Sequence, residues 1–159
     1  MIGLTDKHYA AIGRVAVESC TLDREVGEYL TRLSSMPRRS LMLGDKVTLL
    51  KKILASRPMA AGGNPQFNFA LTKLRDLIDR RNALAHGVWI SEVDSSAYDN
   101  TIARGRKASV RAGDIAAVAE QLRVARKLLL RLCHEYCPIA AGGKRRPASS
   151  VAELMKQLP

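Results

Sequence analysis

The chain has 159 residues, of which 47% are hydrophobic and 26% charged, enough for one globular domain and a short appendage. Its formal net charge of +11 favours nucleic acid as a partner, although a basic surface kept for solubility or for an acidic protein fits equally well. No apolar run is long enough to cross a membrane, and the polar first residues argue against a signal peptide. Three scattered cysteines fit a reducing compartment, so we expect a cytoplasmic protein.

The first predicted element is a long helix that begins with Thr5 or Asp6 as its N-cap and ends at about Ser34, before Pro37. Apolar residues recur in it at intervals of three, four and their multiples, which is typical of a helix with one buried face. These residues are Tyr9, Ile12, Ala16, Val26, Leu30 and Leu33.

Two more helices are predicted in the middle of the chain. One begins at Asp45, as its N-cap, and continues through Leu54. A loop rich in glycine and proline follows over residues 59–65. The next helix covers residues 66–86, and Gly87 is the residue type favoured just beyond a helix C-terminus.

The pattern after this helix is weaker. Residues 87–90 and a segment around 101–110 are predicted to pair as a short hairpin. A fourth main helix opens at Asp114, ends at about Tyr136 and is closed by Pro138. Together the helices predict an all-α fold, an antiparallel bundle of four to five helices.

We predict a division of the chain at residue 138. Residues 1–138 form the bundle, and residues 139–159 form a basic linker with a short C-terminal helix. Ser150 and Glu153 have the spacing of a capping box and open that last helix.

The helix over residues 66–86 carries the residues most suited to chemistry. On a wheel of about 100° per residue, its apolar residues share one arc, which contains Ala70, Leu71, Leu74, Leu77, Ile78, Leu84 and Ala85. Arg81 lies near the middle of this arc, where an unpaired charge is costly, so it needs an acidic partner, a phosphate or another subunit. Arg75, Asp79, Asn82 and His86 form a polar stripe at the edge of the arc.

This polar set suits the cleavage of RNA by attack of the ribose 2′-hydroxyl. A histidine transfers protons near neutral pH and an arginine stabilises the charge on the pentavalent phosphate, so no metal is required. A structural interpretation is also open. In it, Arg81 snorkels from a helix interface, and His86 sits at a helix C-terminus, where the dipole favours a cation.

The sequence Arg81-Asn82-Ala83-Leu84-Ala85-His86 resembles the Arg-x4-6-His motif of HEPN domains, in which a polar residue, often Asn, commonly follows the arginine. The residues from Arg75 onward are also similar to the late helix of that family. The resemblance covers roughly residues 5–136, with the motif as its specific part.

The resemblance implies a bundle that dimerises and brings two motif helices together in a composite, metal-independent ribonuclease cleft. By position, Arg81 would contact the scissile phosphate, Asn82 would orient it, and His86 would be the acid or base. Glu18 and Asp23 in the first helix are the two candidates for an acid that steadies Arg81. Many family members are toxins, anti-phage effectors or RNA-processing factors, and others keep the bundle without catalysis.

Other basic residues are expected to follow an RNA backbone next to the motif. Those singled out are Arg80, Arg104, Arg106 and Lys107. No cofactor or metal is expected. The thiols of Cys133 and Cys137 lack enough further ligands for zinc and are better explained as helix packing.

Two functional hypotheses follow from these residues. The first is a homodimeric HEPN-type endoribonuclease acting on RNA as a toxin, defence effector or RNA-processing factor, with an antitoxin or other protein as a further partner. The alternative is a non-catalytic HEPN-like module that binds RNA or a partner protein. The complete Arg81, Asn82 and His86 set favours the enzyme.

Overall fold

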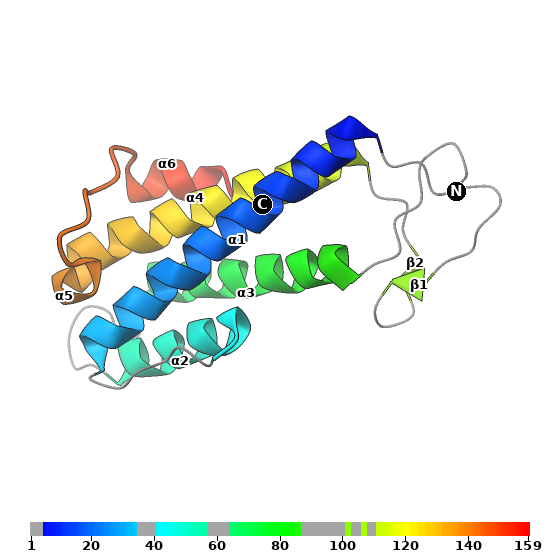
Figure 1. Ribbon diagram of the computed structural model, residues 1–159. Helices are drawn as coiled ribbons and strands as arrows, with labels where there is room; N and C mark the ends of the chain where they lie inside the picture. The colour runs from blue at the N-terminus through cyan, green and yellow to red at the C-terminus, as the bar shows by residue number, and fades with distance from the viewer. Residues whose placement is uncertain (1–4, 35–40, 57–63, 87–100, 103–105, 108–110) are drawn as a thin grey trace.

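The computed structural model describes residues 5–34, 41–56, 64–86, 101–102, 106–107 and 111–159. For residues 85, 86, 101, 102, 106 and 107 this description covers the backbone alone. The described part is mainly helical, which confirms the all-α class (Figure 1). None of its helices combines the length and the apolar character that a membrane crossing needs.

Four long helices build the body of the molecule: α1 (Asp6–Leu33), α2 (Leu43–Ala55), α3 (Pro65–His86) and α4 (Ala112–Tyr136). Two short helices, α5 (Pro138–Ala141) and α6 (Val151–Lys156), complete the C-terminal part. Helix α1 packs against α4 and α2, and α3 packs against the same two helices. The bundle therefore has one layer made of α1 and α4 and a second made of α2 and α3 (Figure 1).

The helix directions depart from the prediction of an antiparallel bundle. Helix α3 does run antiparallel to α4, since Arg80 near its end bonds Gln121 and Gln66 near its start bonds Tyr136. Helices α1 and α4 instead run in the same direction (Figure 1). The prediction was wrong for this pair, because hydrophobic periodicity identifies the buried face of a helix and carries no information on its direction.

Two helix starts lie earlier than predicted. Helix α2 begins at Leu43 with Met42 as its N-cap, and α4 begins at Ala112. The two acids predicted as caps or first residues, Asp45 and Asp114, lie inside the first turns. A carboxylate there is favoured by the helix dipole, so an acid marks the first turn as readily as the cap itself. The predicted caps Thr5 and Ser150 are confirmed.

The core is mainly aliphatic and is contributed by all the long helices. The fully buried side chains include Leu22, Tyr29, Leu50, Phe67, Leu74, Ile115 and Leu128. Val26, Leu30 and Leu33 are buried as predicted, but Tyr9 is 60% exposed and Ala16 is also exposed. The predicted Ile12 is half-buried and packs against the core, and the first half of α1 also buries Ala11 and Val15. The predicted apolar stripe was therefore wrong at Tyr9 and Ala16. The reason is that α1 packs on the bundle through the face that carries Ala11 and Val15, and Tyr9 lies on a different face of the helix.

A short hairpin lies between α3 and α4 in the chain. Strand β1 (Thr101–Ile102) pairs antiparallel with β2 (Arg106–Lys107), and Thr101 faces Lys107. The predicted partner segment, residues 87–90, lies outside the described residues. Both strands therefore lie within the second predicted segment, around residues 101–110, and this segment pairs with itself.

The C-terminal residues pack on the bundle. Pro138 ends α4 as predicted and also starts α5, which was not predicted. Ala140, Ala141, Leu154 and Leu158 are buried in the same core as the long helices. The division at residue 138 stays a prediction, although apolar residues on both sides of it share one core.

The central position of Leu128 gives a test of this packing. Leu128 in α4 has no exposed surface, so Leu128→Ala should lower the free energy of unfolding by about 2–5 kcal/mol through lost contacts and the cavity left behind. Ile139 in α5 is 58% exposed, and Ile139→Ala should change it by less than about 1 kcal/mol. Urea unfolding followed by circular dichroism measures both. Equal losses in the two variants would contradict this placement of α4.

Candidate functional site

Helix α3 positions the predicted motif. Its start is fixed by Asn64, whose Oδ1 accepts hydrogen bonds from the backbone N–H of Gln66 at 2.8 Å and of Phe67 at 3.3 Å. Five residues of the predicted arc are buried, namely Ala70, Leu71, Leu74, Leu77 and Ile78, and Phe67 is buried as well. Leu84 is half-buried, and the side chain of Ala85 lies outside the described residues. The motif occupies the last two turns of this helix.

Arg81 and Asn82 form a hydrogen-bonded pair. Nη1 of Arg81 donates to Oδ1 of Asn82 at 2.8 Å, and both residues are half-buried. Two adjacent residues point about 100° apart on a helix, so the long arginine must bend back to its neighbour. The bond fixes the guanidinium beside the Asn82 amide and leaves further N–H donors of the guanidinium for other acceptors.

The two acids predicted to steady Arg81 pair with other cations. Glu18 lies 3.5 Å from Nη2 of Arg126, measured to its Oε2. Asp23 accepts hydrogen bonds from Nζ of the buried Lys46 at 2.8 and 2.9 Å. Within the described residues, no carboxylate forms an ion pair with Arg81. The predicted contact to Glu18 or Asp23 is therefore not made, because each of these acids lies next to a closer cation on α4 or α2.

Arg75 and Asp79 lie on the surface of α3. They form an i,i+4 ion pair of 3.8 Å between side chains that are 48% and 54% exposed. Arg75 also leans against α2, since its Nη1 is 3.5 Å from the Thr48 hydroxyl and a Cβ added to Gly44 would lie 2.8 Å from it. Arg75 is thus drawn toward α2, six residues before Arg81, and the structure does not bring it to the Arg81–Asn82 pair.

The remaining predicted residues are placed only in part. His86 is the last residue of α3, and its side chain lies outside the described residues. Arg106 and Lys107 form strand β2, where only their backbone is described, and Arg104 is outside the described part. Arg80 is exposed, and its Nη1 donates to Oε1 of Gln121 at 3.2 Å, which ties the end of α3 to α4.

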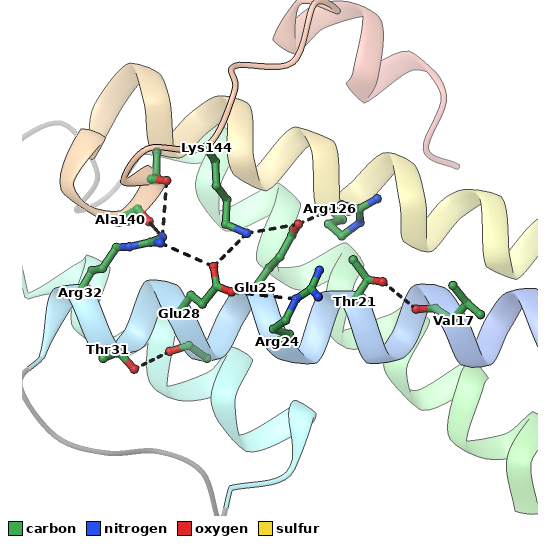
Figure 2. Close-up of polar contacts among 12 residues, drawn as sticks. Val17, Thr21, Arg24, Glu25, Glu28, Thr31, Arg32, Arg126, Ala140 and Lys144 are labelled. Atoms are coloured by element: carbon green, nitrogen blue, oxygen red, sulfur yellow. Dashed lines mark hydrogen bonds and ion pairs between the residues drawn. The ribbon is translucent and has the colours of Figure 1, made fainter.

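Sequence reasoning missed a charged network on α1 (Figure 2). Glu25 has a side chain only 8% exposed and pairs with Nη1 of Arg126 at 3.1 Å and with Nζ of Lys144 at 3.5 Å. Lys144 also reaches Glu28 at 2.9 Å, and Glu28 lies 3.6 Å from Nη2 of Arg32. The network joins α1, α4 and the C-terminal segment. The available signal was the seven-residue spacing of Glu18 and Glu25, which places both acids on one face of α1.

Arg32 extends this network to α5. Its Nη1 donates to the carbonyl oxygen of Ala140 at 3.0 Å. Its guanidinium also lies against Gly142, where an added Cβ would be 2.7 Å away. Gly142 has a φ of 56°, in the left-handed region that favours glycine. The chain therefore turns at Gly142 to bring Lys144 over α1.

Burial changes the titration of two groups near the network. Burial raises the pKa of Tyr29 well above its ordinary value, and the negative charge of Glu25 raises it further. Burial likewise raises the pKa of the Cys133 thiol. Both groups are therefore neutral at physiological pH, and neither is an activated nucleophile or base.

The described residues contain no group of three or more histidine, cysteine or acidic side chains placed to bind a metal ion. Comparison with known proteins found no matching family model, no matching curated protein and no matching solved structure. The assignment of function therefore rests on the chain's own residues.

The Arg126 contacts predict a strong effect on stability. Arg126→Ala should lower the free energy of unfolding by about 3–5 kcal/mol, because Glu18 and the buried Glu25 would lose their shared cation. The control is Arg24→Ala on α1, whose side chain is 70% exposed and whose ion pair to Glu28 is 4.0 Å long. This control should cost less than about 1 kcal/mol. Chemical denaturation compares the two, and a similar small loss in both would refute a structural role for Arg126.

Proposed function

We propose that the protein is a metal-independent endoribonuclease of the HEPN type. The observation that carries this proposal is the burial and the hydrogen bonding of Arg81. Its guanidinium is half-buried, is fixed to Asn82 at 2.8 Å, and forms no ion pair with a carboxylate of the described residues. A partly buried cation that is not neutralised favours an anion as its ligand, and an RNA phosphate is such an anion.

The proposed reaction is an attack of the ribose 2′-oxygen on the adjacent phosphorus. A base removes the proton of the 2′-hydroxyl, a bond forms between the 2′-oxygen and phosphorus, and the bond to the 5′-oxygen breaks. An acid then protonates the leaving 5′-oxygen, which gives a 2′,3′-cyclic phosphate and a 5′-hydroxyl. In this proposal His86 is the acid or base, Arg81 stabilises the added charge on the phosphate, and Asn82 holds Arg81 in position.

A homodimer belongs to the same proposal. The chain offers one histidine in the motif, whereas the reaction uses both an acid and a base. A two-fold axis would supply a second copy of the motif, with one histidine from each chain in a shared cleft. The net charge of +11 supports RNA as the ligand, since it attracts the phosphate backbone at long range.

The test is RNA cleavage by the purified protein in the presence of EDTA. We expect cleavage of single-stranded or loop RNA, with a 2′,3′-cyclic phosphate on the upstream product. His86→Ala should lower the rate about 100- to 10,000-fold while the circular dichroism spectrum stays helical. Arg81→Ala should also lose most of the activity. Asn82→Ala should have the mildest effect of the three, because Arg81 keeps its charge.

The matched control is Arg24→Ala, which removes an exposed arginine from the other layer of the bundle and should leave cleavage unchanged. RNA binding should survive His86→Ala and weaken steeply with salt. Binding with that salt dependence but without cleavage of any RNA would replace the enzyme with a non-catalytic RNA-binding module. A protein that neither binds nor cleaves RNA would refute the proposal.

A further inference from the structure

The outer face of α1 carries apolar side chains that the described part of the chain leaves exposed. Tyr9 is 60% exposed and Val17 is 64% exposed. Gly13 lies midway between them, four residues from each, so the three form one i±4 row along the helix. A Cβ added to Gly13 would meet no atom within 4 Å. The fold of one chain therefore gives no steric reason for a glycine here, which costs about 1 kcal/mol against alanine.

A groove runs beside this row, between α1 and α4. It encloses about 510 Å³, and we name it the α1–α4 groove. It is lined by Ala10, Gly13, Arg14, Val17, Glu18, Ala116, Ala119, Glu120 and Arg123. Small residues form much of this lining, so another helix can approach the two backbones closely.

The charges of the α1–α4 groove cancel. It contains two arginines and two glutamates, and Glu120 is held by hydrogen bonds from Arg123, which lower the pKa of Glu120. The whole chain, in contrast, carries a net charge of +11. A strongly basic surface attracts polyanions and repels a second copy of the same chain. The groove is thus a part of the surface where a second copy can approach without that repulsion.

We propose that the α1–α4 groove binds a second copy of this chain, with the two α1 helices crossing at Gly13 about a two-fold axis. An axis perpendicular to α1 makes the two helices run antiparallel, so positions at equal distances on either side of Gly13 lie against each other. Tyr9 of each copy then packs against Val17 of the partner subunit, and the exposed apolar row covers itself. Nucleic acid is disfavoured as the occupant because the groove has no net charge.

This contact lies in a different part of the molecule from the motif. The groove is formed by the α1 and α4 layer, whereas Arg81 and Asn82 belong to α3 in the other layer. The contact is therefore distinct from a shared cleft formed by two motif helices, and it does not rest on the proposed ribonuclease activity. Substitutions on α1 leave the Arg81–Asn82 pair untouched, so the two proposals can fail separately.

Sedimentation velocity tests the proposal on the full chain. At about 50 µM, where a micromolar interface is filled, we expect the wild-type protein to sediment above the 17.4 kDa of one chain. Val17→Glu should shift it to a lower mass, because a carboxylate would be buried against the partner's Tyr9. Thr31→Glu is the matched control on the same helix, exposed and about five turns from Gly13, and should leave the mass unchanged. Wild-type protein that is wholly monomeric, or equal effects of both variants, would overturn the proposal.

Cysteine cross-linking tests the axis directly and does not depend on tight binding. In a Cys20→Ser background, which removes the exposed thiol, Gly13→Cys should form a covalent dimer on mild oxidation, because position 13 meets its own copy at the axis. Thr31→Cys should not, since its copies lie far apart. Circular dichroism checks that both variants remain folded. Failure of Gly13→Cys to link faster than Thr31→Cys would exclude an axis at this position.

Discussion

The contact between Arg126 of α4 and two acids of α1 holds the molecule in its observed arrangement. Glu18 and Glu25 lie two turns apart on α1, and Arg126 lies between them with a side chain only 20% exposed. Charges this far from water are costly unless they are paired. A slip of α4 along α1 by one turn would separate Arg126 from at least one acid. The ion pairs thus disfavour a shift in register between the two helices.

The ion pairs of α1 also bear on the charge near the motif. With α1 and α4 in register, Glu18 is committed to Arg126, and Asp23 is committed to Lys46 on α2. Neither acid neutralises Arg81, which lies on α3 and bonds Asn82 instead. Among the described residues, no carboxylate therefore neutralises the positive charge of Arg81 near the end of α3. This is the electrostatic condition that an anion-binding role for Arg81 requires.

Features of the fold that depend on local sequence were predictable, and those that depend on the meeting of distant segments were not. The cap at Thr5, the capping box at Ser150 and the buried arc of α3 follow from spacing within a few residues. The parallel course of α1 and α4 does not, because a periodic pattern reads the same for either direction. The ion-pair partners of Glu18 and Asp23 could not be predicted from the sequence either. A helix wheel can indicate that an acid on a packed face needs a cation as its partner. It does not identify which of the 26 lysines and arginines of the chain is that partner.

The turn at Gly142 shows how composition can mislead about the role of a segment. A run of glycine, lysine and arginine has the composition of a flexible linker, in which most residues are interchangeable. At residue 142 the positive φ disfavours a side chain, and an added Cβ would also require the Arg32 guanidinium to move. A side chain at position 142 would therefore be strained, while the neighbouring Gly143, whose Cβ position is open, can accept one. Two adjacent and identical residues thus differ in their tolerance of a side chain.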